Sequence, residues 1–164
     1  MKKQLIATFI IMSFPFLIVS CVSSLLQEKA PTFSKSIQFS DPKDPFYRLN
    51  KSIYPAWKNK NTGAVISIIS DCADQTQSLM SLQQLILDSI EQPKIIKQEQ
   101  ITFQNKPANF VTATGQLEQN DIEVHSISFK RKGCGYVTSL SGKINSLQND
   151  QKSFKDFNES FRFE

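Results

Sequence analysis

The clearest pattern in the chain is a stripe of large apolar residues at helical spacing between Ser78 and Glu91. Residues three or four positions apart lie on one face of a helix, so this spacing predicts an amphipathic helix with one buried side. Ser78 or Thr76 can cap its start, and Pro93 is expected to stop it. The stripe consists of Leu79, Leu82, Leu85, Ile86 and Ile90.

A second stripe at helical spacing lies near the end of the chain, between Asp150 and Phe161. Phe154, Phe157 and Phe161 follow one another at spacings of three and four residues. Asp150 stands at the start of this stretch as an N-cap candidate. We expect a closing helix that packs its aromatic side on a β-sheet.

The other apolar stretches are short and are separated by turn-forming residues, which predicts β-strands. The polar loop 59–63, Asn-Lys-Asn-Thr-Gly, predicts a hairpin between two of them. The later strands have connections too short for a parallel crossover, so we expect an antiparallel meander. The expected strands are Ser36–Phe39, Phe46–Leu49, Ala56–Lys58, Ala64–Ser70, Ile95–Phe103, Ala108–Leu117, Ile122–Lys130 and Cys134–Ser141.

Eight strands and two helices predict an α+β fold, with a mostly antiparallel sheet packed against two helices. The pattern leaves open whether the helices cover one face of this sheet or both. At 164 residues the chain has room for one ordinary domain and a short additional segment. We place the single α+β domain at residues 36–164.

The first 20 residues have the zones of an export signal. Lys2 and Lys3 supply a positive start, the stretch Leu5–Val19 is largely apolar, and a small residue, Ser20, ends it. An apolar stretch of this length is short for a membrane span, which needs about 18 residues or more, and Pro15 would kink it. A retained transmembrane helix is therefore the weaker alternative.

The boundary sequence Ile18-Val19-Ser20-Cys21 resembles the lipobox of bacterial lipoproteins. The resemblance implies cleavage between Ser20 and Cys21 and lipidation of Cys21, and two or more acyl chains hold a protein stably at a membrane. The alternative is an ordinary signal peptide followed by a chance cysteine. Residues 22–24 lack the acidic residue that retains enterobacterial lipoproteins at the inner membrane. The resemblance thus implies the outer membrane, facing the periplasm, in a host with two membranes.

These features divide the chain into three parts. Residues 1–20 are the expected lipoprotein signal peptide. Residues 21–35 are rich in polar residues and lack apolar periodicity, so we expect a lipidated, flexible tether. The α+β domain of residues 36–164 follows.

The formal net charge of +4 overstates how basic the exported protein is. Two of the positive charges belong to Lys2 and Lys3, and without them 17 basic residues face 15 acidic ones. The cluster Lys130–Lys132 precedes Gly133 and is typical of a solvated hairpin end. Nucleic-acid binding is therefore not expected.

Three cysteines bear on the chemistry of the domain. If Cys21 is lipidated, Cys72 and Cys134 remain as a pair in an oxidising compartment, and we expect a structural disulfide between them. A redox-active pair is an alternative, although neither cysteine belongs to a C-x-x-C motif. A metal site is another, but the chain has a single histidine, His125, and no cluster of ligands at metal spacing. We predict neither a metal nor a cofactor.

His125 and Glu123 are the strongest candidates for acid–base chemistry. They lie two residues apart in an expected strand and would share one of its faces. No nucleophile is visible beside them, so we interpret His125 as a half-exposed strand residue. We predict no catalytic residues and no enzymatic activity.

Several stretches resemble a loosely characterised group of bacterial lipoproteins. They are the hairpin from Trp57 to Ile68, the turn Gly133-Cys134-Gly135-Tyr136 and the aromatic helix from Phe154 to Phe161. These proteins are similar in architecture to the Mog1/PsbP/DcrB-like α/β/α sandwich, and the resemblance covers residues 36–164. Such sandwiches serve several functions, so this fold implies no single one.

The anchor, the tether and the lack of catalytic residues predict a lipid-anchored, periplasmic binding or assembly module of the cell envelope. Its partner would be an envelope protein or a glycan. One alternative is an envelope enzyme that uses Cys72, Cys134 or His125. Another is a carrier that holds a small apolar molecule between the sheet and a helix.

Overall fold

The computed structural model describes residues 37–73 and 76–163. Residues 31–164 form one compact unit, and its described part holds the hydrophobic clusters and the disulfide. The expected signal peptide, Cys21 and the tether lie outside the described residues. Within the described ranges, neither helix is long and apolar enough to cross a membrane.

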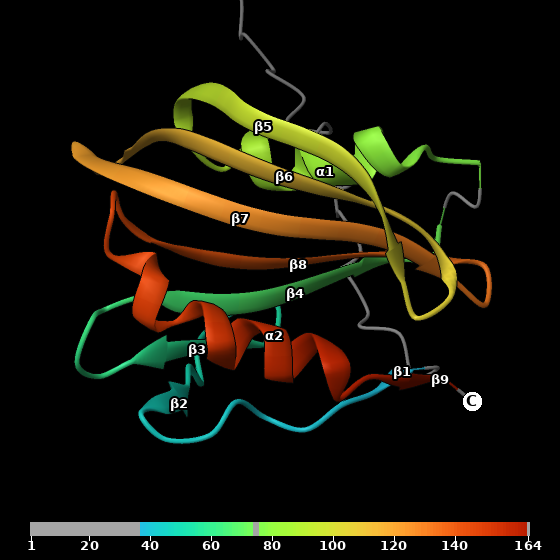
Figure 1. Ribbon diagram of the computed structural model, residues 1–164, viewed down its shortest axis with the longest axis horizontal. Helices are drawn as coiled ribbons and strands as arrows, with labels where there is room; N and C mark the ends of the chain where they lie inside the picture. The colour runs from blue at the N-terminus through green and yellow to red at the C-terminus, as the bar shows by residue number, and fades with distance from the viewer. Residues whose placement is uncertain (1–36, 74–75, 164) are drawn as a thin grey trace, which may run out of the picture. The chain divides into compact units, whose positions relative to one another are not determined.

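The unit is built on an antiparallel sheet of seven strands in the order β2-β3-β4-β8-β7-β6-β5 (Figure 1). This arrangement confirms the predicted sheet. It also shows that β5 and β2 are the edge strands. The strands are β2 (Phe46–Arg48), β3 (Ala56–Asn59), β4 (Val65–Asp71), β5 (Glu91–Phe103), β6 (Lys106–Leu117), β7 (Asn120–Arg131) and β8 (Cys134–Lys143).

The two ends of the described unit form a small sheet of their own. Strand β1 (Ile37–Gln38) pairs antiparallel with β9 (Arg162–Phe163). A stretch as short as β9 has no periodicity of its own, which is why the sequence pattern did not predict it. The pairing holds the segment after β1 against the final helix, where Ser160 Oγ accepts a hydrogen bond from Ser40 N at 3.1 Å.

The meander from β5 to β8 turns three times through two-residue loops. These are Gln104–Asn105, Glu118–Gln119 and Lys132–Gly133, and all six residues have positive φ angles between 47° and 78°. Two consecutive positive φ angles are the geometry of tight hairpin turns that match the twist of long strands. The strands therefore extend closer to the turns than the sequence predicted, and Lys130–Lys132 lies at a hairpin end as expected.

Helix α1 (Leu79–Leu87) begins where the sequence predicted and ends earlier. The Ser78 hydroxyl accepts a hydrogen bond from Ser81 N at 3.0 Å and caps the helix. The prediction that Pro93 stops the helix is wrong, because Pro93 lies inside β5 at a break in the β5–β6 register. Ile90 follows the helix and is buried in the same cluster as α1, so its helical spacing was coincidental.

The two helices cover opposite faces of the sheet, which resolves the choice that the sequence left open (Figure 1). Side chains alternate between the faces of a strand. In β7, Val124 belongs to the cluster beneath α1, and Ser128, four residues further along the strand, donates a hydrogen bond to Leu79 O. The residue after it, Phe129, packs on the other face, in the cluster that contains α2 (Gln151–Glu159). The fold is an α/β/α sandwich.

An aromatic cluster determines where α2 packs. Trp57 of β3 is 1% exposed, and its ring lies 5.1 Å from Phe157 of α2. Phe39 contacts both rings edge-on, and Phe161 packs against Phe157 directly after the helix. Trp57 is thus a core residue, and the cluster holds α2 over the β3, β4 and β8 half of the sheet (Figure 1).

Asp150 precedes α2 but does not cap it through its side chain. Its carboxylate instead accepts hydrogen bonds from Asn59 Nδ2 at 2.5 Å and from Thr62 Oγ1 at 2.8 Å. Both donors belong to the β3–β4 hairpin, whose loop was predicted correctly. The expected N-cap is thus a buried contact that joins the hairpin loop to the start of α2.

Candidate functional site

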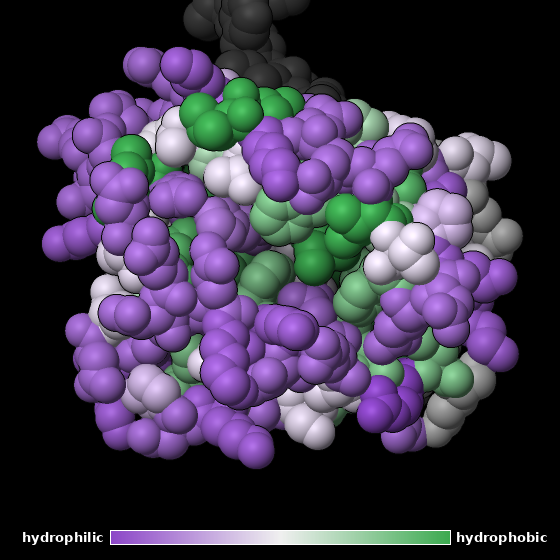
Figure 2. Space-filling view, in the orientation of Figure 1, coloured by the Kyte–Doolittle hydropathy of each residue, from purple (hydrophilic) through white to green (hydrophobic). Residues whose placement is uncertain are grey.

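A groove lies between α2 and the part of the sheet that α2 leaves uncovered. Figure 2 shows a hollow in the middle of this face, with hydrophobic residues inside it and hydrophilic residues around it. The cavity has a volume of about 420 Å³. It is lined by Lys97, Phe103, Phe110, Thr112, His125, Ile127, Gln151, Phe154, Lys155, Asn158 and Glu159.

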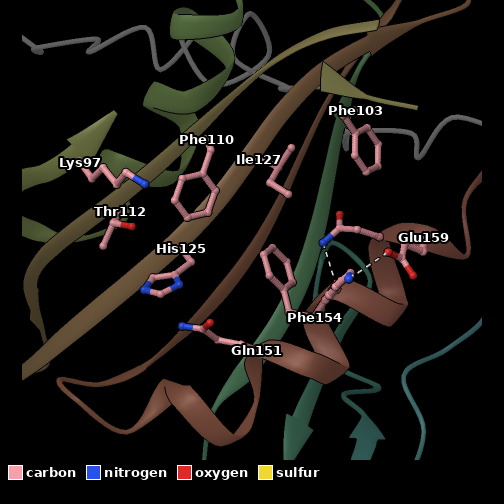
Figure 3. Close-up of a pocket in the computed structure, with 11 residues that line it drawn as sticks. Lys97, Phe103, Phe110, Thr112, His125, Ile127, Gln151, Phe154 and Glu159 are labelled. Carbon is pink, nitrogen blue, oxygen red and sulfur yellow. Dashed lines mark hydrogen bonds and ion pairs between the residues drawn. The ribbon is translucent and has the colours of Figure 1, made fainter. Parts of the chain in front are cut away.

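The floor of the groove comes from neighbouring positions of β6 and β7. Phe110 is paired in register with Ile127, and Thr112 is paired with His125. Paired residues of antiparallel strands point to the same face, and positions two apart along a strand share that face as well. The four side chains therefore form one patch, and Figure 3 shows them all directed toward the space beside α2.

One side of α2 forms the opposite wall. Successive lining residues of this helix are alternately three positions and one position apart, so they lie along one side of the helix. Among them Asn158 is buried, and it is held by hydrogen bonds to Thr138 and to Phe154 O. The lining residues of the helix are Gln151, Phe154, Lys155, Asn158 and Glu159.

Glu123 and His125 form the most closely bonded polar pair at the groove. His125 Nε2 lies 2.6 Å from Glu123 Oε1, and the two side chains are 12% and 20% exposed. The other oxygen of Glu123 accepts a hydrogen bond from Asn145 N at 3.3 Å. A carboxylate can only accept, so Nε2 carries the proton in this bond. In the neutral ring, Nδ1 is then left as an acceptor.

The two lysines at the rim already have anionic partners. Lys97 Nζ lies 3.0 Å from Glu99 Oε1 and 5.9 Å from the centre of the Phe110 ring. Lys155 Nζ lies 3.7 Å from Glu159 Oε1, one helical turn away. The groove therefore combines an apolar interior with a rim of balanced charge, an arrangement common in sites for small molecules.

The resolved pKa shifts belong to residues outside the groove. A hydrogen bond between Lys152 and Asp156, on the exposed side of α2, raises the pKa of the lysine and lowers that of the carboxyl. Partial burial lowers the pKa of the Arg131 guanidinium. Arg131 donates to Phe103 O at 2.7 Å and ties the β7–β8 turn to the β5–β6 turn.

Cys72 and Cys134 form the predicted disulfide, with an S–S distance of 2.11 Å. Cys72 directly follows β4 and Cys134 begins β8, and these strands are neighbours in the sheet. The bond joins the β3–β4 hairpin to the meander. Within the ranges that the structure describes, no group of three or more His, Cys, Asp or Glu residues is placed to hold a metal ion.

Sequence reasoning identified one part of this groove and missed the rest. It placed His125 and Glu123 on one strand face, and the structure brings them into a hydrogen bond beside the groove. It gave no role to Phe110 or Thr112. The alternation of apolar and polar residues in β6 indicated that the two side chains share a face. The local sequence did not indicate that α2 leaves this part of the sheet uncovered.

Comparisons with known proteins come from structure alone, because no family model and no curated protein sequence matches this chain. LpqN, described as involved in cell envelope biogenesis of Mycobacterium tuberculosis, matches with a TM-score of 0.52 and 12% identity, over 76% of this chain and 81% of that one. The cyanobacterial PsbP protein (CyanoP) of Synechocystis sp. PCC 6803 matches with a TM-score of 0.50 and 10% identity, over 80% of this chain and 84% of that one. At such identities the likeness shows the fold, an α+β sandwich of the PsbP type.

Proposed function

We propose that this protein is a lipid-anchored binding module of the bacterial cell envelope, and that it holds the apolar part of its ligand in the groove beside α2. The observation that carries the proposal is the partial cover of the sheet. Helix α2 covers the β3, β4 and β8 half of its face, and the neighbouring half presents aromatic and aliphatic side chains to a groove of about 420 Å³.

The size and lining of the groove fit a small ligand. Sites for small molecules have volumes of about 300–1,000 Å³ and are lined mainly by apolar and aromatic side chains, with a few polar groups that orient the ligand. Three phenylalanines and Ile127 supply the apolar lining here, while Thr112, His125 and Gln151 supply polar groups. Of the functions expected from the sequence, binding of a molecule with an apolar part accounts for these features best.

Binding without catalysis is favoured by the partners of His125. A histidine that activates a nucleophile needs a hydroxyl or thiol within hydrogen-bonding distance. Among the described residues, no Ser, Thr or Cys side chain donates a hydrogen bond to His125, and two of the three cysteines are consumed by the disulfide. We therefore assign the Glu123–His125 pair a role in binding.

The proposed location in the cell envelope rests on the boundary sequence Ile18-Val19-Ser20-Cys21, and it is supported by the fold that this chain shares with LpqN. Cells grown with an alkyne-tagged fatty acid should label the wild-type protein, and a Cys21→Ala variant should carry no label. Cys72→Ala serves as the matched control and should remain labelled. Equal labelling of the Cys21→Ala variant would exclude this lipid anchor.

Binding in the groove can be tested with the neutral fluorescent dye N-phenyl-1-naphthylamine and the compact unit from Pro31 to Glu164. We expect the dye to brighten on binding, because it leaves water for an apolar site. Phe110→Ala removes the ring from the groove floor and should weaken binding about tenfold, given about 1.5–3 kcal/mol for a fully buried large apolar side chain. Leu85→Ala alters an exposed leucine of α1, on the opposite face, and should leave binding unchanged.

A dye signal that is absent, or that Leu85→Ala reduces as much as Phe110→Ala does, would exclude the groove as the binding site. Both variants need the same unfolding midpoint as the wild type for this comparison. Their folding is checked by circular dichroism.

A further inference from the structure

We propose that the Glu123–His125 pair selects the polar end of the ligand, and that the groove takes a neutral amphiphile whose head donates a hydrogen bond, such as a hydroxyl. This inference rests on the proposed binding function and adds the chemical class of the ligand. It follows from the hydrogen bonding of the imidazole, from the charges around the groove and from the position of His125 within it.

The bond to Glu123 fixes the hydrogen-bonding role of His125. Glu123 Oε1 accepts from Nε2 at 2.6 Å, and its other oxygen accepts from Asn145 N, so the carboxylate is held in place from two sides. When the ring is neutral and its proton is on Nε2, Nδ1 presents a lone pair. Among the described residues, no group donates a hydrogen bond to Nδ1. A ligand that donates there would pair with an acceptor on a side chain that is 12% exposed.

The charges around the groove favour a neutral head over an anionic one. Lys97 is paired with Glu99, and Lys155 is paired with Glu159. Glu123, by contrast, is bonded to the imidazole of His125 and to a backbone amide. Among the described residues, no lysine or arginine is paired with Glu123. A carboxylate or phosphate head beside His125 would be repelled by Glu123, whereas a hydroxyl would not.

The arrangement of the lining also gives the ligand an orientation. Figure 3 places Lys97, Thr112 and His125 together toward one end of the groove and Phe103 toward the other. Phe110 and Ile127 lie between these ends. A hydroxyl at Nδ1 of His125 would thus leave an alkyl chain to run over Phe110 and Ile127 toward Phe103. Thr112, opposite His125 in register, adds a second polar group at the head.

The proposal predicts discrimination between ligands that differ only in donating ability. 1-Decanol and 1-methoxynonane are isomers with the same number of heavy atoms, but the ether cannot donate a hydrogen bond. Each is titrated against the bound dye on the unit from Pro31 to Glu164, and the ratio of their displacement midpoints is recorded. In the wild type, the ratio should show a preference for the alcohol over the ether. In His125→Phe, this preference should be about threefold to tenfold smaller, which corresponds to the loss of one hydrogen bond.

Three further measurements identify the source of the discrimination. His125→Gln retains an acceptor and should preserve part of the alcohol preference, which separates loss of the acceptor from general damage to the groove. Glu123→Gln can accept or donate toward the ring, so it no longer fixes the tautomer and should reduce the preference. Leu85→Ala alters an exposed residue of α1, on the opposite face of the sheet and outside the groove, and should leave the ratio unchanged. Decanoate should displace the dye more weakly than 1-decanol at neutral pH.

The outcomes separate this inference from the function on which it rests. If both isomers displace the dye and His125→Phe leaves their ratio unchanged, head-group selection by His125 is wrong and the groove remains a binding site. A decanoate midpoint lower than that of 1-decanol would overturn the neutral class of ligand. If the dye does not bind at all, the proposed binding function fails and this inference fails with it.

Discussion

Removal of the disulfide should destabilise the domain without changing its fold. The bond joins two residues separated by 62 positions. The chain-entropy relation for a loop of this length gives about 4 kcal/mol at 25 °C, because the unfolded chain without the bond explores many more conformations. In the folded state, β4 and β8 remain paired from Val65 to Asp71. The Cys72→Ala/Cys134→Ala variant should therefore fold and be less stable by roughly this amount.

Unfolding in urea, followed by the fluorescence of Trp57, measures this loss directly. The chain has a single tryptophan, and its ring is buried in the aromatic cluster, so its emission reports on the core. With a denaturant dependence of about 2 kcal/mol per molar urea, the midpoint should fall by about 2 M. Wild-type protein with reductant present should unfold at the midpoint of the double variant. The slope of the transition shows whether the unfolded state has expanded.

A loss of stability below about 1 kcal/mol would refute the reasoning, because it would mean that the bond restricts the unfolded chain little. Labelling of native and unfolded wild-type protein with a thiol reagent separates two causes of such a result. Reaction of Cys72 and Cys134 without reductant would show that the bond does not form. Protection of both, with a small stability change, would show that the unfolded chain is already compact around this link.

Two other predictions concern contacts between elements. A Cβ atom at Gly135 would lie 2.6 Å from Leu82 Cδ1, so Gly135→Ala should lower the free energy of unfolding by about 1–3 kcal/mol. In a Leu82→Ala background the same change should cost less, because the clashing side chain is gone. If the losses of the two single variants simply add in the double variant, the origin of the loss is not steric. Asp150→Ala leaves Asn59 and Thr62 without their acceptor and should cost about 1–3 kcal/mol in urea unfolding, with unchanged helical circular dichroism. A loss of helical signal instead would mean that Asp150 does cap α2.

The sequence by itself determined most of the secondary structure and the disulfide. Short apolar stretches separated by turn-forming residues defined the strands of the meander, and the stripe from Leu79 to Ile86 defined α1, because both patterns are local properties of the chain. Ser78 was found as the cap for the same reason, since its bond to Ser81 spans three residues. The even pair of cysteines was visible once Cys21 was assigned to the lipid anchor.

The tertiary structure decided where these elements meet. The stripe of α2 predicted that its phenylalanines pack on a sheet, but the position along that sheet follows from Trp57 and Phe39, which are about 100 residues away in sequence. Asp150 bonds to the β3–β4 loop and does not cap α2 through its side chain, and α1 ends at Leu87 although Ile90 is buried in the same cluster. The groove exists because α2 covers only part of its sheet face. Only the folded chain therefore places His125 and Phe110 at the surface of the groove.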